Sequence, residues 1–260
     1  MGLRINNNVE AFNSHRNLSV SSGKAAKAME KLSSGFRINR AADDAAGLAI
    51  SEKMRGQIGG LAQAQRNAQD GISLVQTAEG ALTEVHSMLN RVRELKVQYD
   101  NGTLNTEDKS AINKEITALA AEISDISLQT KFNDKTLFGT ATFEFVVGAA
   151  GTEKITTDAV SLASAAALTS ASTVASIDEA IKVVSESRAG LGAVQNRLEH
   201  RLNNLATYQE NLVAAESRVR DVDMAQEMVN FSKLQILQQA GTAMLAQANQ
   251  SSQGVLSLLR

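Results

Sequence analysis

Few side chains in this chain have the type and spacing that catalysis or metal binding requires. The three histidines, His15, His86 and His200, lie far apart in the sequence, and no HExxH motif is present. The absence of cysteine excludes disulfides, thiolate metal ligands and cysteine nucleophiles. The sequence therefore predicts no catalytic residue, no metal site and no cofactor, and we expect the protein not to be an enzyme.

One dense group of charged side chains stands out in residues 32–57, which read LSSGFRINRAADDAAGLAISEKMRGQ. A helix break at Gly35 precedes it, and alanine-rich helix follows. The group consists of Arg37, Arg40, Asp43 and Asp44. Two interpretations are open: a local ion cluster at a helix start, or a contact between subunits or segments. Because an exposed ion pair contributes only about 0–1 kcal/mol, we favour the contact between subunits or segments.

Long helices must position these residues. The chain has no proline, a residue that costs a helix interior ~3 kcal/mol or more, so long uninterrupted helices are permitted. Apolar residues recur every three or four positions in residues 44–99, which predicts a long amphipathic helix. A turn around Asn101 and Gly102 should end it, with Thr106 as the N-cap of the next helix.

Two further apolar seams predict the partners of this helix. Ile112 to Ile126 form a strict coiled-coil seam two heptads long. A capping box of Ser176 and Glu179 should begin the third helix, whose seam continues through Tyr208 to Val222.

The middle of the chain has a different pattern. Phe143, Phe145 and Val147 alternate with polar or small residues before a glycine-bounded turn, which predicts a β-hairpin. Residues 161–176 are mostly Ala, Ser and Thr and are expected to form a weakly ordered connection. The predicted fold class is mainly α: a long-helix coiled-coil or bundle rod formed by the N- and C-terminal segments, with one small β-hairpin in the middle.

The last part of the chain is uncharged. No charged residue occurs between Leu234 and Leu259, although glutamine is frequent there. Such a surface suits burial against other copies of the chain, with some amides facing a wet interior. The sequence has no run of 18 apolar residues, so no membrane span is predicted. A net charge of −2 argues against a general nucleic-acid binder. The N-terminus lacks an apolar signal-peptide core, so any export is expected to need no cleaved leader.

Several motifs resemble those of bacterial flagellin. Besides residues 32–57, GALTEVHSMLNRVRELKVQ at 80–98 and TKFNDKTLFG at 130–139 resemble flagellin motifs. So do RLEHRLNNLATYQENLVAAESRVR at 197–220, the following DVDMAQEMV and the terminal VLSLLR. The resemblance covers nearly the whole chain except its middle, and the motifs occur in the family's order.

The resemblance implies a structural subunit that polymerises into the helical flagellar filament for motility, secreted to the extracellular bacterial flagellum. Residues 1–42 with 221–260 would form the inner tube, and 43–137 with 176–220 a rod-like helical bundle. The hairpin and connection at 138–175 leave no room for the family's large outer domains. The implied partners are the chain itself, a flagellin export chaperone, the flagellar export apparatus, filament cap and hook–filament junction proteins, and host innate immune receptors. Since isolated helices are marginal in water, the chain ends should become ordered only on assembly.

Four groups of residues are candidates for contacts. The subunit-contact candidates are Arg37, Arg40, Asp43, Asp44, Leu234, Leu237, Met244 and Leu245. The lumen-lining candidates are Gln235, Gln238, Gln247 and Gln250. The resemblance also implies a host-receptor-like surface at Arg91, Leu95 and Glu115, although Arg91 with Glu94 also fits an ordinary solvated face. The C-terminal recognition candidates are Leu256, Leu258 and Leu259.

Other classes of function remain as alternatives. A hook–filament junction protein shares such chain ends but assembles in few copies. A soluble coiled-coil adaptor, or a membrane-active amphipathic protein, would use the same helices without forming a polymer.

Overall fold

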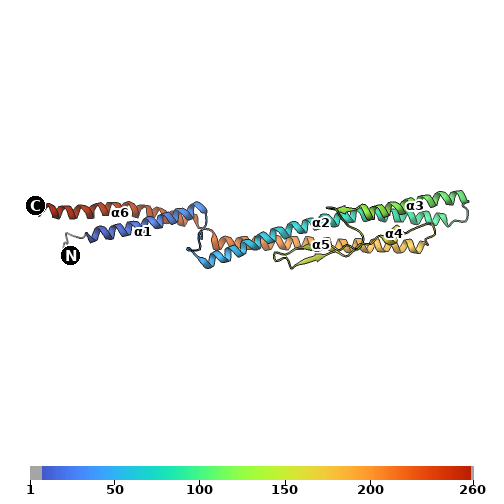
Figure 1. Cartoon of the computed structure of the whole chain (residues 1–260), viewed down its shortest axis with the longest axis horizontal. Helices are drawn as coiled ribbons and strands as arrows, with labels where there is room; N and C mark the ends of the chain where they lie inside the picture. Colours follow the sequence, from blue (N-terminus) through green and yellow to red (C-terminus); the bar gives the residue numbers. More distant parts are fainter. Residues whose placement is uncertain (1–7, 259–260) are drawn as a thin grey trace. The chain divides into compact units, whose positions relative to one another are not determined.

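The computed structural model describes the backbone of residues 8–258 and the side chains of residues 8–250. Six helices dominate this part of the chain (Figure 1). They are α1 (Val9–Ser34), α2 (Ala45–Tyr99), α3 (Thr106–Gln129), the short α4 (Ala163–Ala166), α5 (Val174–Arg220) and α6 (Met224–Leu258). Across the described residues, no helix combines the length and apolar character needed to span a membrane. The prediction of a mainly α fold is confirmed.

Four short strands form two antiparallel pairs. They are β1 (Lys131–Phe132) with β2 (Lys135–Thr136), and β3 (Glu144–Val146) with β4 (Lys154–Thr156). In the second pair Phe145 lies opposite Ile155, which confirms the predicted β-hairpin. The first pair was not predicted.

The chain divides into two compact units. Met1–Arg55 and Leu212–Arg260 form the first, here called the terminal unit, and Gly56–Asn211 form the second, the central unit. The boundary falls inside α2 and α5, so each of these two helices contributes residues to both units.

The core of the central unit is built from the predicted apolar seams. Leu82, Val85 and Leu89 of α2 are fully buried, together with Ile116 of α3 and Leu198 of α5. These side chains belong to one hydrophobic cluster that also includes residues of the hairpin and of the segment around α4. Burial of a large aliphatic side chain contributes about 1.5–3 kcal/mol, so this cluster supplies the central unit with a core of its own.

Three details of the helices correct the sequence predictions. The N-cap of α3 is Asn105 rather than Thr106, because the Asn105 side chain accepts the Asp108 N–H and Asp108 completes a capping box. Helix α5 begins before Ser176, since Thr173 Oγ1 accepts the Ser176 N–H at 3.2 Å. Tyr208 is 46% exposed and lies outside the α5 seam.

The prediction of a weakly ordered connection is wrong for much of residues 161–176. Leu162, Ala165 and Leu168 are buried in the central core. Lys96 of α2 also donates a hydrogen bond from Nζ to the Ser170 carbonyl at 3.2 Å. Small residues are common here because the chain lies close against the helices, not because it lacks partners.

The β3–β4 hairpin is held by polar side chains from two helices. Asn67 of α2 donates a hydrogen bond to the Val146 carbonyl at 3.0 Å. Arg201 of α5 donates from Nε to the Val147 carbonyl at 3.1 Å. At Gly71 an added Cβ would lie 3.0 Å from the Phe145 ring, so a larger residue would push the strand away.

The β1–β2 turn has two non-glycine residues in the left-handed region. Asn133 has φ 49° and Asp134 has φ 62°, and the flanking residues Phe132 and Lys135 pair with each other. Two positive φ angles in a two-residue loop are typical of a type I′ turn, whose second position favours glycine.

We predict that Asp134→Gly stabilises the chain by up to about 1 kcal/mol, because glycine adopts a positive φ without the steric cost that a Cβ brings. Urea unfolding followed by circular dichroism measures the change. The matched control is Asp134→Ala, which removes the same carboxylate but keeps a Cβ and should lower stability. Equal effects from the two substitutions would contradict the turn assignment.

Candidate assembly surface

Helices α1 and α6 of the terminal unit pack side by side along their length (Figure 1). They run antiparallel, because Asn8 Nδ2 donates to the Ala248 carbonyl at 2.9 Å near one end. Near the other end the Val222 N–H donates to the Gly35 carbonyl at 3.0 Å. The pair therefore forms a two-helix hairpin whose contact faces can be read from the burial of each residue.

Buried and half-buried residues recur at alternating steps of three and four on both helices, which is the coiled-coil repeat. On α1 this seam consists of Ala11, Ser14, Leu18, Ser21, Ala25, Ala28 and Leu32. On α6 it consists of Glu227, Phe231, Leu234, Gln238, Gly241, Leu245 and Ala248. Each helix thus has one stripe that faces the other.

The seam is narrow because so many of its residues are small. An added Cβ at Gly241 would lie 3.2 Å from Leu18 Cδ1, so the two backbones approach closely there. Leu18 facing Gly241 places Ser21 near the level of Gln238, a polar layer in the middle of the seam. Because apolar burial scales with the area removed from water, alanine and serine stabilise this pair far less than leucines would.

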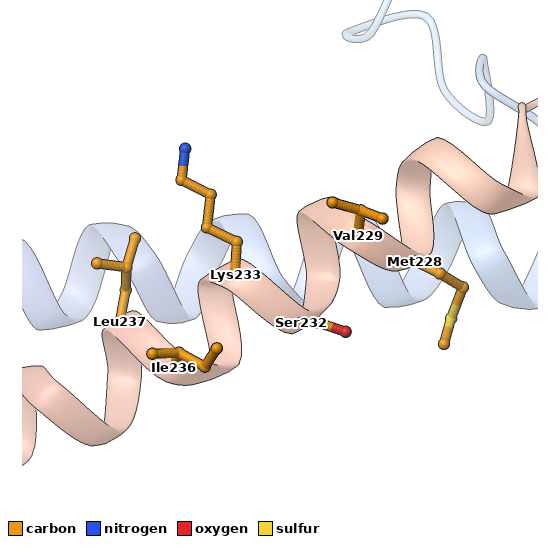
Figure 2. A pocket seen from close by; sticks show the side chains of 6 residues that line it. All are labelled: Met228, Val229, Ser232, Lys233, Ile236 and Leu237. Carbon is orange, nitrogen blue, oxygen red and sulfur yellow. The ribbon is translucent and has the colours of Figure 1, made fainter.

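A second apolar stripe of α6 has no partner among the described residues. Met228, Val229, Ile236 and Leu237 line a shallow surface groove together with Ser232 and Lys233, all from α6 (Figure 2). Val229 and Ile236 are among the most exposed large apolar side chains of the described part of the chain. A helix that is apolar on both sides is typical of one buried on both sides.

Charge is almost absent from α6. Glu227 and Lys233 are the only charged residues in its sequence. Depletion of charge is typical of the core of an interface between subunits. An exposed apolar stripe of this kind, with Lys233 as the one charged residue that lines its groove, marks a surface for protein association.

The predicted α6 contact and lumen residues do not share one face. Leu234 and Leu245 are half-buried in the seam against α1, whereas Leu237 and Met244 are exposed. Gln238 also lies in the seam, which separates it from the other lumen candidates. Gln235, Gln247 and Gln250 are exposed on the described surface, and their lumen role stays a prediction.

The loop after α1 is tied to the end of α5. Gly35 ends α1 in the left-handed conformation, with φ 76°. The Arg37 N–H donates to the Arg220 carbonyl at 2.6 Å, and the Arg37 guanidinium donates to the Val219 carbonyl at 2.5 Å. Backbone hydrogen bonds thus join two segments that are far apart in the sequence.

The other members of the predicted charged group also have partners within the chain. Arg40 pairs with Glu30 at 2.8 Å. Asp43 accepts the N–H groups of Arg40 and Asn39, and the hydrogen bond from Arg40 is the main cause that lowers the pKa of this carboxyl. Asp44 accepts the Gly47 N–H at 2.9 Å at the start of α2. Arg40, Asp43 and Asp44 thus have local partners, whereas Arg37 contacts a distant segment of the chain, and a contact of these residues with another subunit stays a prediction.

Sequence reasoning missed a polar cluster centred on Arg220. Its side chain is only 11% exposed, and Nη1 lies 2.8 Å from Glu52 Oε1 and 3.3 Å from Ser51 Oγ. Its guanidinium also lies 4.8 Å from the centre of the Phe36 ring. Ser51 in turn donates to Glu216 at 3.0 Å. Ser51 is fully buried, which only the structure shows, so the sequence held no clear signal for this cluster.

The predicted receptor-like surface needs a correction. Leu95 is 2% exposed, because it belongs to the same inward stripe of α2 as Leu89 and Val92. Arg91 and Glu115 are exposed and form an ion pair at 2.9 Å, and hydrogen bonding to Glu115 raises the pKa of Arg91. Recognition of these two by a receptor stays a prediction.

The C-terminal recognition candidates lie outside the described residues. No side chain is described for Leu256 and Leu258, and Leu259 follows the last described position.

We predict that Arg220→Ala loosens the terminal unit. Removing a hydrogen-bonded, nearly buried charge costs about 1–3 kcal/mol, which corresponds to an increase in local opening of roughly 5- to 150-fold. Hydrogen exchange at the Arg37 and Val222 amides measures this opening. Arg55→Ala is the control, since the Arg55 side chain is half exposed and reaches Glu52 and Glu216 only at 3.8 and 4.0 Å. Equal exchange in the two variants would contradict the role of Arg220.

Both helical ends of the chain match a known family. Residues 5–142 match the model of the bacterial flagellin N-terminal helical region, and residues 174–259 match that of the C-terminal helical region. The unmatched middle, residues 143–173, contains β3, β4, α4 and their connections.

Relatives with this pattern extend over almost the full length. A flagellin of Halalkalibacterium halodurans is 54% identical, covering 98% of this chain and 99% of its own. A flagellin of Bacillus subtilis is 52% identical, covering 99% and 100%. The crystal structure of Bacillus cereus flagellin is 32% identical with a TM-score of 0.51, covering 58% of this chain and 94% of its own. Family models at both ends and relatives of this similarity establish that the chain belongs to the bacterial flagellin family, in a form without large outer domains, and is a structural subunit of the flagellar filament.

Proposed function

We propose that the chain joins the filament through its terminal unit, with the second apolar stripe of α6 covered by neighbouring copies of the chain. In this proposal residues 1–42 with 221–260 form the inner tube, and 43–137 with 176–220 form the rod around it. Residues 138–175 contribute the hairpin and its connection. The observation that carries the proposal is that α6 is apolar on two sides and has a partner within the chain on only one.

The geometry of the pair favours an open polymer. The seam between α1 and α6 occupies one face of each helix. Contacts with other copies must therefore use the remaining faces of α1 and α6. A contact between unlike faces is heterologous, and it generates a helical filament when the rotation does not close into a ring. Exposed Phe12 and Val20 on α1 offer an apolar face that could receive the outward stripe of another copy.

Assembly should also order the chain ends. Half of the seam residues are alanine, serine or glycine, and a helix in a protein gains most of its stability from tertiary packing. The central unit, by contrast, has an extended cluster of leucine, isoleucine and valine. We infer that the terminal unit opens readily in the free chain and becomes stable when neighbours cover its second stripe.

The finer partners follow from the same surface. An uncharged apolar helix that must stay unassembled inside the cell needs a cover, which supports an export chaperone on α6. We infer that the flagellar export apparatus exports the chain to the extracellular flagellum. The filament would begin on hook–filament junction proteins and grow beneath a filament cap. The exposed Arg91–Glu115 pair is the candidate for contact with host innate immune receptors. The role is mechanical, and we infer no catalytic activity.

We predict that Ile236→Asp reduces elongation from filament seeds at least tenfold, because a carboxylate buried in an apolar contact has no partner. Leu128→Asp is the matched control, since Ile236 and Leu128 are both 65% exposed and Leu128 lies on α3 of the central unit. Electron microscopy of seeded reactions measures filament length. Similar elongation by the two variants would contradict the proposed surface. Rings or short caps from the unchanged protein would favour a junction protein.

We predict that amides of α1 and α6 exchange at least a hundredfold faster in the free chain than in filaments, because their stability comes from neighbouring copies. Amides of α2 near Leu82 and Leu89 should be protected in both states and serve as the internal control. Hydrogen exchange with mass spectrometry measures both sets. Equal protection of α6 in the free chain and in filaments would contradict ordering on assembly.

A further inference from the structure

The exposed methionines of the described chain gather in one unit. Met29, Met224, Met228 and Met244 are between 48% and 62% exposed, and all four lie in α1 or α6. Met88 instead packs against the core of the central unit. Met54, on α2, is only half-buried but is less exposed than these four.

Three of the four thioethers lie beside the surfaces on which the proposed assembly depends, and Met224 is the first residue of α6. Met228 lines the groove of the second apolar stripe (Figure 2). Met244 lines another groove, together with Asn13 and Ser14 of α1. Met29 directly follows Ala28 of the seam, so it flanks the contact between the two helices.

We propose that these four methionines form an oxidation site that controls whether a free subunit can join the filament. This inference rests on the proposed function of the terminal unit. The reactant is a peroxide: a lone pair of the thioether sulfur attacks one peroxide oxygen, the O–O bond breaks, and water leaves after proton transfer. The sulfur is oxidised by two electrons to the sulfoxide, and the peroxide is reduced.

The sulfoxide opposes assembly because it replaces a flexible apolar group by a polar one. A polar oxygen buried without a hydrogen-bond donor is unfavourable, and the groove around Met228 offers mainly apolar side chains. The reaction is confined to the free subunit, since neighbouring copies would cover the same sulfur atoms in the polymer. The change is reversible, because methionine sulfoxide reductases restore the thioether.

The test uses the purified full chain, hydrogen peroxide and filament seeds. Peptide mapping by mass spectrometry should show that the four methionines oxidise at least tenfold faster than Met88 in the free chain. The oxidised chain should elongate seeds at least tenfold more slowly. Treatment with methionine sulfoxide reductases should restore the rate. Preformed filaments should oxidise more slowly at the same four positions.

A variant with Met29→Leu, Met224→Leu, Met228→Leu and Met244→Leu is the matched control. Its elongation rate should be the same before and after peroxide treatment, so the comparison is made within the variant and does not depend on its rate relative to the unchanged chain. If it elongates but remains equally sensitive to peroxide, the site is wrong. Reductase rescue of the unchanged chain tests the same point without any substitution.

Two failures can be told apart. Elongation at the full rate by a chain oxidised at all four positions would overturn the oxidation site and leave the proposed function intact. Failure of the untreated chain to elongate seeds would instead overturn the proposed function.

Discussion

A helix can bury one stripe against one neighbour, and α6 has two stripes to bury. Its seam packs on α1, and its second stripe, around Val229 and Ile236, has no partner among the described residues. Charge on α6 is confined to Glu227 and Lys233, and its other polar side chains are amides and hydroxyls. In the proposed function, neighbouring copies of the chain cover this second stripe, which is why a chain with a well-packed central unit still polymerises.

The two units bury their apolar side chains in different ways. In the central unit, seams from α2, α3 and α5 join with Phe145, Ile155 and Leu162 in a single apolar cluster. In the terminal unit, the seam of α1 is mostly alanine and serine, which permits close approach but removes little apolar area from water. A narrow seam leaves the outer faces of both helices free for other copies, whereas a broad one would use them up. In the proposed function, low stability of the free terminal unit and its tendency to assemble have this one cause.

The polar cluster around Arg220 joins segments of the terminal unit that the α1–α6 seam does not connect. Guanidinium contacts to Glu52, Ser51 and the Phe36 ring, with backbone hydrogen bonds beside them, join the loop after α1 to the ends of α5 and α2. A planar group with several donors suits this site, because it can contact a carboxylate, a hydroxyl and an aromatic face at once. The charges of the loop thus have partners inside the chain.

The sequence by itself determined the helices, the seams of the central core, the β3–β4 hairpin and the family, because periodicity and motif order are local properties of the chain. It could not determine which residue faces which. Only the tertiary structure placed Leu95 inside the core, Gln238 in the α1–α6 seam, and Arg220 beside Ser51 and Phe36. It also decided that Asn105 caps α3 and that Asn133 and Asp134 form the turn of an unexpected hairpin. An apolar repeat shows that a face is buried, but the partner that buries it comes from a distant segment, and only the packed structure brings the two together.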